Sequence, residues 1–273
     1  MYGRVRSDEA PSRYNGPLRH PGVCTTVRRL ICPMPYRSMS LEEFAKHVAL
    51  DVREVRKLAN RGKLPGHKVG GQWRFNQARV TEWLQQEMHA LDEDRLIALE
   101  RAMSRVASDA VDDADMVVTD LIGLDGVNIA LPAKTKPSVL RELVKLADRT
   151  GLLYDREGLL KAIEQRESLC STALPNGVAI PHPRQPMPYV SAEPFICVAR
   201  LSPGIAFGAP KRELTRVFFL ICCHTDRYHL RVLARLMRIL DDPTVALVLE
   251  AETREELLEI LIAKEERVVA QTR

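Results

Sequence analysis

Hydrophobic positions between residues 40 and 62 repeat every three or four residues, which predicts two short amphipathic helices. Ser40 and Glu43 match a capping box, in which each side chain satisfies the other residue's free amide, so the first helix begins there. Asp51 caps the second helix and Gly62 ends it. The inward faces are formed by Leu41, Phe44, Ala45 and Val48 in the first helix and by Val52, Val55 and Leu58 in the second. The pattern predicts a helix–turn–helix.

A hairpin and a third helix are predicted to follow. A Gly-Gly turn separates two short strand-like runs within His67–Phe75. Another helical pattern begins at Asn76. Its inward residues are Val80, Trp83 and Leu84. Helix–turn–helix, hairpin and helix is the order of a winged-helix domain, which we assign to residues 39–88.

Residues 89–113 have the pattern of a connector helix. Leu96, Leu99, Met103 and Val106 come close to a 3-4-3 repeat, but two heptads are too few to predict a coiled coil. Two interpretations stay open: the helix packs on a neighbouring domain, or it forms the stalk of a homodimer. An acidic run at 112–115 ends this connector, which we assign to residues 89–115.

The remaining segment, 116–268, alternates apolar strand-like runs with amphipathic helices, which predicts an α/β domain. The predicted strands are Val127–Leu131, Gly177–Ile180, Phe195–Leu201 and Leu214–Cys223. The predicted helices are Pro137–Arg149, one capped by Asp155, one over Tyr228–Leu240, and a last one opened by a Thr253/Glu256 capping box. The last two strands are almost continuously apolar, as expected of central strands that are buried on both faces.

Charge is segregated along the 273 residues, although the net charge is only +4. Residues 1–38 carry seven basic against two acidic side chains, and residues 39–88 carry nine against six. Residues 89–115 carry three against eight, and the rest is nearly neutral. Basic charge at the front of the chain indicates a module that faces nucleic acid.

Residues 1–38 are rich in Arg, Pro, Gly and Ser without periodicity, which predicts disorder. Because Met39 stands directly before the first helix cap, a misassigned start site is one interpretation of this extension. A basic arm that contacts phosphates is the other.

The six cysteines form no CxxC pair and no cysteine–histidine metal spacing. We therefore expect no disulfide, no metal site and no cofactor. No apolar run approaches the ~18 residues that span a membrane, and no secretory signal precedes the first helix. A cytoplasmic location is expected.

The polar face of the second helix, together with the hairpin, is the candidate DNA-binding surface. Its residues are Arg53, Arg56, Lys57, Asn60, Arg61, Lys68 and Arg74. An ordinary solvated basic face is the alternative. However, Ser40–Leu84 resembles the excisionase-type, MerR-like winged-helix family, with a Gly62-Lys63-Leu64-Pro65 turn, a Lys68-Val69-Gly70-Gly71-Gln72-Trp73-Arg74 wing and a Trp83-Leu84 helix. That resemblance implies DNA binding.

His182 is the candidate reactive residue of the second domain. It follows a short strand-like run and lies between Pro181 and Pro183, which restrict the backbone on both sides. An imidazole is mostly neutral near pH 7, so one ring nitrogen keeps a lone pair for attack on phosphorus.

The segment from about Val118 to Leu261 resembles the IIA domain of the phosphotransferase system, of the fructose, mannitol and nitrogen-regulatory class. The resemblance is carried by Arg166-Glu167-Ser168-Leu169-Cys170-Ser171-Thr172, Asn176-Gly177-Val178-Ala179-Ile180-Pro181-His182, Phe207-Gly208-Ala209 and His229-Leu230-Arg231-Val232-Leu233. It implies a mixed sheet flanked by helices. It also implies that His182 accepts a phosphoryl group from a histidine phosphocarrier protein.

The same resemblance implies roles for three further residues. His229 matches the family's second active-site histidine, and we prefer it to the nearby His224. Arg166 offsets phosphate charge, and Thr172 donates a hydrogen bond to a phosphate oxygen. The chain departs from the family pattern at Ala173-Leu174-Pro175 and at Pro183, which puts a stiffer rim beside the histidine.

The function expected from the sequence is a cytoplasmic regulator that is phosphorylated on His182 and couples this to DNA binding. It would be a phosphocarrier component with a phosphohistidine intermediate rather than a self-contained enzyme. The alternatives are a phosphocarrier that acts by docking to proteins, and an inert IIA-fold interaction module.

Overall fold

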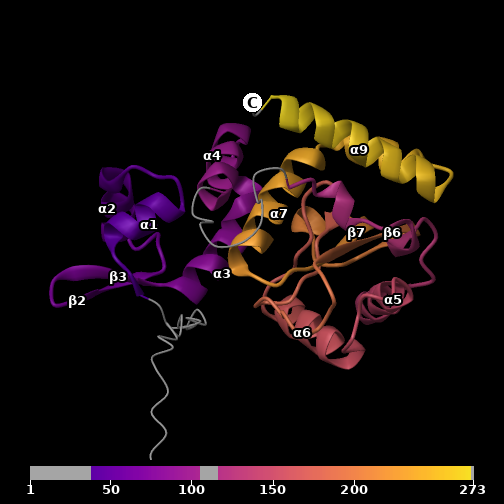
Figure 1. Cartoon of the computed structure of the whole chain (residues 1–273), viewed down its shortest axis with the longest axis horizontal. Helices are drawn as coiled ribbons and strands as arrows, with labels where there is room; N and C mark the ends of the chain where they lie inside the picture. The colour runs from indigo at the N-terminus through magenta and orange to yellow at the C-terminus, as the bar shows by residue number, and fades with distance from the viewer. Residues whose placement is uncertain (1–37, 105–115, 272–273) are drawn as a thin grey trace, which may run out of the picture. The chain divides into compact units, whose positions relative to one another are not determined.

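The computed structural model describes residues 38–104 and 116–271 (Figure 1). The described residues belong to one structural unit. The expectations for residues 1–37, and for the part of the connector at 105–115 with Val106, lie outside the described residues.

Residues 38–90, here called the winged-helix module, have the predicted order of elements and one additional strand. The elements are β1 Ser38–Met39, α1 Leu41–His47, α2 Val52–Asn60, β2 Gly66–Val69, β3 Gln72–Asn76, α3 Gln77–Glu87 and the 3-10 turn η1 Met88–Ala90. The three strands form an antiparallel sheet in the order β1-β3-β2. The predicted caps are confirmed: Ser40 and Glu43 exchange hydrogen bonds of 2.8 and 3.1 Å, and Asp51 accepts one of 2.7 Å from the Arg53 amide.

The core of this module is aromatic and aliphatic. The rings of Phe44 and Phe75 stack with centroids 4.3 Å apart, and Trp83 lies 6.0 Å from Phe44. Val55 of α2 and Val80 of α3 are fully buried, as their spacing predicts. Packing against this core fixes α2 relative to the hairpin.

The body from residue 116 onward contains a four-stranded sheet in the order β4-β6-β7-β5. The strands are β4 Val127–Asn128, β5 Val178–Ala179, β6 Phe195–Ile205 and β7 Thr215–Cys222. The helices are α5 Lys136–Arg149, α6 Arg156–Leu169, α7 Asp226–Ile239, α8 Asp242–Glu250 and α9 Arg254–Ala270, with 3-10 turns η3 Thr119–Leu121, η4 Leu124–Gly126 and η5 Pro210–Arg212. β6 and β7 pair antiparallel, while the outer strands pair parallel to them. The predicted mixed sheet is confirmed.

Side chains of the central strands alternate between two helical layers. Cys197, Ala199 and Phe218 pack with α5 and α6, whereas Val198 and Phe219 pack with α7, α8 and α9. Figure 1 shows α5 and α6 on one side of the sheet and α7 and α9 on the other. Both faces of β6 and β7 are therefore buried, which accounts for their continuously apolar sequences.

Several predicted boundaries were wrong. β4 ends at Asn128 rather than Leu131, because the Asn128 side chain accepts a hydrogen bond of 2.9 Å from the Ala130 amide and turns the chain. β5 is limited to Val178–Ala179, and β6 extends to Ile205. α7 begins two residues before the predicted start, because Thr225 caps it.

At the C-terminal end, α8 is a helix that we had not predicted, although Asp241 caps it and accepts a 3.0 Å hydrogen bond from the Thr244 amide. Thr253 caps α9 as predicted. The capping box also predicts that the Glu256 side chain accepts a hydrogen bond from the Thr253 amide. That prediction was wrong, because Glu256 accepts from the Glu252 amide instead.

The connector is described over residues 89–104. Its helix was predicted to begin at residue 89, which was wrong: η1 covers Met88–Ala90, and the helix α4 covers Glu93–Ser104 and packs on α7. Leu96, Leu99 and Met103 are buried, as predicted. Two interpretations were left open, packing on a neighbouring domain and a homodimer stalk. The described residues of α4 agree with the first, because they pack on α7. The homodimer stays a prediction.

A buried charge cluster joins α4 to α7 and α9. The Glu100 carboxylate accepts hydrogen bonds from Arg235, with Nε at 2.9 Å, and from Arg238, with Nη1 at 3.1 Å. Arg235 also donates to Glu265 at 2.9 Å. All four side chains are at most 6% exposed. Breaking a buried pair of this kind is costly, so the cluster holds α4 firmly against α7.

Candidate functional site

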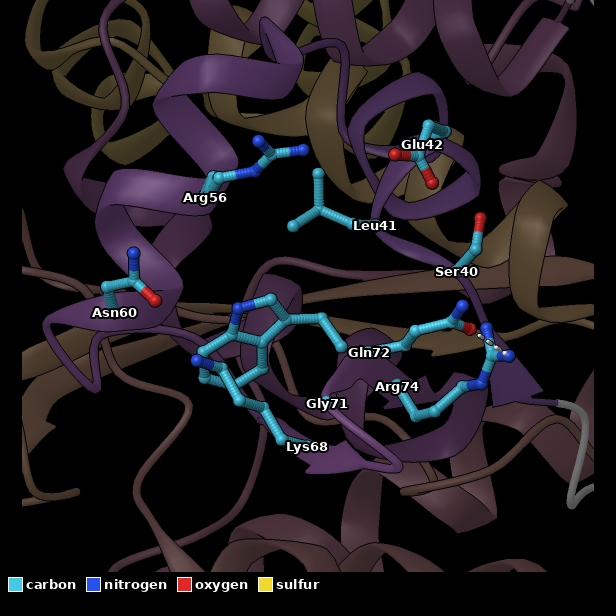
Figure 2. A pocket seen from close by; sticks show the side chains of 10 residues that line it. Ser40, Leu41, Glu42, Arg56, Asn60, Lys68, Gly71, Gln72 and Arg74 are labelled. Carbon is cyan, nitrogen blue, oxygen red and sulfur yellow. Dashed lines mark hydrogen bonds between the residues drawn. The ribbon is translucent and has the colours of Figure 1, made fainter.

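The winged-helix module has a hollow of ≈ 420 Å³ between α2 and the hairpin (Figure 2). Of the predicted DNA-binding residues, Arg56, Asn60, Lys68 and Arg74 line it. Arg56 and Asn60 are one turn apart on α2, so they project from the same face of the helix. The structure thus brings four of the seven predicted residues together.

The strand side of this hollow is held in place by two local contacts. Arg74 donates a 3.0 Å hydrogen bond to Gln72, and the Lys68 ammonium lies 5.3 Å from the centre of the Trp73 ring. Gln72 and Trp73 were not among the predicted contacts, although both belong to the quoted wing sequence. Glu42 is a lining residue of opposite charge.

Arg53, Lys57 and Arg61, the other predicted DNA-binding residues, are exposed but do not line the hollow. Arg53 and Lys57 belong to α2 and Arg61 is its C-terminal cap. They add positive charge around the hollow, where a nucleic-acid backbone would be attracted.

His182 lies at the end of β5 and is fixed by backbone hydrogen bonds. The Ile221 amide of β7 donates to the Pro181 carbonyl at 3.0 Å, and the Ile180 amide donates to the Thr172 carbonyl at 3.1 Å. The His182 Nδ1 atom lies 2.7 Å from the Ile180 carbonyl oxygen. Since a carbonyl only accepts, Nδ1 carries the proton, and Nε2 keeps the lone pair.

His229 is the second histidine of this site. It is the fourth residue of α7, and its ring centroid lies 4.9 Å from that of His182. Both rings are buried, and their Nε2 atoms have no hydrogen-bond partner within the described part of the chain. His224 has Nε2 3.1 Å from the Ser191 hydroxyl. The preference for His229 therefore agrees with the geometry.

Arg166 supplies the positive charge at this histidine pair. Its Nη1 donates to the Cys170 carbonyl at 2.8 Å, while its buried Nε has no partner among the residues described. Burial, followed by the charges of His229 and Arg166, holds the pKa of His182 well below its ordinary value. Burial and then Arg166 lower the pKa of His229 to about 4. Both rings are therefore neutral at pH 7 and can act as nucleophile or acceptor.

Thr172 is close to the site, but its hydroxyl is already engaged. It donates to Glu167 at 2.6 Å, and the Thr172 amide donates to the same carboxylate at 3.1 Å. Lys136 of α5 pairs with Glu167 at 2.8 Å. The predicted hydrogen bond from Thr172 to a phosphate would require its hydroxyl to leave Glu167. Glu167 and Lys136 were missed as site residues; Glu167 is in the quoted motif, whereas Lys136 has no signal in the sequence.

The rim carries the two prolines that depart from the family pattern. Pro175 is exposed and Pro183 is buried. The next residue, Arg184, is exposed and donates a 2.8 Å hydrogen bond to Glu82 of α3. This contact between the histidine loop and the winged-helix module was not predicted.

Acidification is expected to destabilise the fold through the buried histidines. Because the pKa of His229 is about 4 in the folded state and 6.5 ordinarily, the unfolded chain binds a proton first as pH falls. The free energy of unfolding should therefore fall between pH 6.5 and 4, by up to about 3 kcal/mol from this residue. Urea unfolding of His229→Gln should show a correspondingly shallower pH dependence.

His67→Gln is the matched control, because it makes the same substitution at an exposed histidine outside the pair. His47, whose pKa burial and then Arg227 lower to about 4, should retain part of the slope in both variants. An identical slope in His229→Gln and the unmodified chain would contradict the assignment.

Within residues 38–104 and 116–271, no group of three His, Cys, Asp or Glu side chains is placed to hold a metal ion. None of the helices in these two ranges is long and apolar enough to cross a membrane.

Comparison with known proteins identifies two segments of the chain. The profile of the family described as "Phosphoenolpyruvate-dependent sugar phosphotransferase system, EIIA 2" matches residues 120–264, which is more than half of the chain. The profile described as "Helix-turn-helix domain" matches residues 38–88.

Individual proteins are similar over the same second half. The chain is 33% identical over 139 residues to a nitrogen regulatory protein of Bradyrhizobium diazoefficiens, covering 50% of this chain and 88% of that one. It is 28% identical over 149 residues to the PTS system fructose-specific EIIABC component of Bacillus subtilis, covering 54% of this chain and only 23% of that protein. The crystal structure of nitrogen regulatory protein IIA-Ntr from Neisseria meningitidis aligns with a TM-score of 0.49 and 21% identity, covering 54% of this chain and 99% of that one.

With a family match over more than half of its length, the chain belongs to the phosphoenolpyruvate-dependent sugar phosphotransferase system EIIA type 2 family, and it carries a helix-turn-helix domain at residues 38–88.

Proposed function

We propose that this chain is a cytoplasmic regulator that accepts a phosphoryl group on His182 from a histidine phosphocarrier protein and couples this to DNA binding. One observation carries the proposal: the bond from His182 Nδ1 to the Ile180 carbonyl leaves Nε2 with a lone pair beside His229 and Arg166. Membership of the EIIA type 2 family and the similarity to a nitrogen regulatory protein support it.

In the proposed step, the Nε2 lone pair of His182 attacks the phosphorus of the donor's phosphohistidine. The new nitrogen–phosphorus bond forms as the donor's bond breaks, and that electron pair returns to the donor ring. If the donor ring keeps a proton on its other nitrogen, it leaves as neutral imidazole. The proton stays on His182 Nδ1, which donates its hydrogen bond to the Ile180 carbonyl, and this bond stabilises the positive charge that the acceptor ring gains.

Arg166 and His229 are proposed to stabilise the phosphoryl group. Phosphoryl transfer depends mainly on positioning and on neutralising negative charge. The Nε–H of Arg166 lacks a partner among the described residues and can donate to a phosphate oxygen. His229 offers a second ring nitrogen on the opposite element, α7.

The test is phosphorylation of the purified chain by a phosphoenolpyruvate-driven relay. Intact-mass measurement should show the gain of one phosphoryl group, and peptide mapping should locate it on His182. A chain that gains no phosphoryl group under conditions that label another IIA domain would leave the inert interaction module as the function.

Coupling is proposed to run through α7. A phosphoryl group brings about −1.5 to −2 charges to the site. α7 carries His229 near its start and Arg235 and Arg238 further along, and these arginines hold Glu100 of α4. α3 of the winged-helix module also contacts α7, so a change of charge near the start of this helix can bias how that module is held.

DNA binding is expected to depend on the basic face of α2. Replacing Arg56 and Lys57 together with alanine should weaken binding by about 1–3 kcal/mol and reduce the slope of log affinity against log salt by roughly 2, because each lost phosphate contact contributes ~0.9. Fluorescence anisotropy over a salt series would measure both quantities on duplexes taken from a genomic-site selection.

The matched control is Arg141→Ala with Lys161→Ala, which removes two exposed cations from α5 and α6. It lowers the net charge equally and should leave affinity and slope unchanged. Equal effects of the two double variants, or a selection that enriches no sequence, would favour a phosphocarrier that acts by docking to proteins.

A further inference from the structure

The reactive nitrogen of His182 is closed off in this arrangement of the chain. The His182 side chain is 3% exposed and that of His229 is 4% exposed. Nε2 of His182 is buried, although it must approach a donor's phosphorus to about 3–3.5 Å before transfer. A phosphocarrier therefore cannot reach it until something moves.

Elements from the N-terminal side of the chain contact both segments that carry the histidines. Arg184, two residues after His182, donates to Glu82 of α3 at 2.8 Å. α3 also contacts α7, the helix of His229. Arg227, two residues before His229, donates to the Ala102 carbonyl of α4 at 3.3 Å. The winged-helix module thus adjoins the rim of the histidine site.

We infer that α3 of the winged-helix module and the phosphoryl donor compete for the same face around His182. Docked α3 keeps the site closed, and a phosphoryl group on His182 favours the undocked module. This inference rests on the proposed function of His182 and adds a second partner for its surface, the chain's own α3.

The phosphoryl group would act directly on the ion pair at this face. The Cα atoms of His182 and Arg184 are at most about 7 Å apart, so the Arg184 guanidinium can reach a phosphate on the histidine. A dianion attracts that guanidinium more strongly than the Glu82 carboxylate does, and it repels Glu82. Coupling between two sites is reciprocal. If docking of the module makes phosphorylation of His182 less favourable, then phosphorylation of His182 makes docking of the module less favourable.

The docked contact is suited to opening, unlike the joint between α4 and α7. The Arg184 and Glu82 side chains are 53% and 25% exposed, and exposed pairs are weak. On α3, the Thr81 hydroxyl and the Gln85 amide are buried without a hydrogen-bond partner in the two described ranges, which makes their burial unfavourable. By contrast, Glu100 is almost fully buried and bonded to two arginines. We therefore expect α3 to leave while α4 stays on α7.

The experiment measures the initial rate of phosphorylation of the full chain by the relay, in four proteins: unmodified, Glu82→Arg, Arg184→Glu, and the double charge exchange. Glu82→Arg should be labelled roughly two- to fivefold faster, the range that loss of one exposed ion pair allows. The double exchange restores the pair with unchanged net charge, so its rate should return toward that of the unmodified chain. Glu142→Arg, which disrupts an exposed pair within α5, is the matched control and should have no effect.

A second measurement follows α3 itself. Hydrogen exchange of the α3 amides should become faster when the chain is phosphorylated and should be faster in Glu82→Arg even without phosphate. Equal labelling rates and unchanged exchange in chains that are phosphorylated on His182 would overturn the competition and leave the proposed function standing. If none of the four proteins takes up a phosphoryl group, the proposed function fails and the competition fails with it.

Discussion

Replacing His182 with alanine is expected to abolish phosphoryl uptake, reducing it to the background of an unphosphorylatable protein. The reason is that Nε2 of His182 is the proposed attacking atom, and no bond to phosphorus can form without it. His229 should not substitute, because its proposed role is to stabilise the group on its neighbour. Transfer of radiolabel from phosphoenolpyruvate through the relay measures the effect directly.

The control for this variant is His224→Ala. That histidine is bonded to Ser191 and has no role in the proposed transfer, so its loss should leave labelling at the level of the unmodified chain. If His182→Ala were labelled as well as His224→Ala, the acceptor would be another residue and the transfer step proposed above would be wrong.

Replacing Glu100 with alanine is expected to lower the free energy of unfolding by about 3–5 kcal/mol, the cost of breaking a buried ion pair by removing one member. Arg235 would keep Glu265, but Arg238 would lose its buried carboxylate. Arg238 is 1% exposed, so water cannot readily replace that contact. Urea unfolding, followed by circular dichroism, would measure the loss.

Glu93→Ala is the control for the Glu100 variant, since it lies on the same helix and faces the same arginine. Its carboxylate is 60% exposed and 3.8 Å from Arg238, so it should cost less than about 1 kcal/mol. Similar losses in the two variants would mean that the buried bonds of Glu100 contribute no more to stability than a surface pair.

The sequence predicted those elements whose signals are local. The Ser40 capping box, the cap at Asp51 and the apolar runs of β6 and β7 each occupy a few consecutive residues, and the corresponding elements are present. Strand ends were predicted less well. β4 stops where the Asn128 side chain accepts a hydrogen bond from the Ala130 amide. This side-chain bond competes with the backbone hydrogen bonds of the strand, and a pattern of apolar residues does not reveal it.

The candidate site was predictable only in part, for the same reason. The resemblance gave His182, His229 and Arg166, and their rings and charges do come together. It gave no indication that the Thr172 hydroxyl donates to Glu167. Glu82 and Arg184 are 102 residues apart, and Glu100 and Arg235 are 135 apart. Contacts over such separations depend on how whole elements pack, which no local pattern encodes.

The hydrogen bond between His182 Nδ1 and the Ile180 carbonyl also has a chemical consequence for the product. Because that nitrogen is occupied by its proton, the proposed transfer would place the phosphoryl group on the nitrogen remote from the main chain, giving the tele isomer of phosphohistidine and not the pros isomer. The two isomers are distinguished by antibodies and by nitrogen chemical shifts. A single backbone carbonyl thus determines which form of the modified residue other proteins would meet.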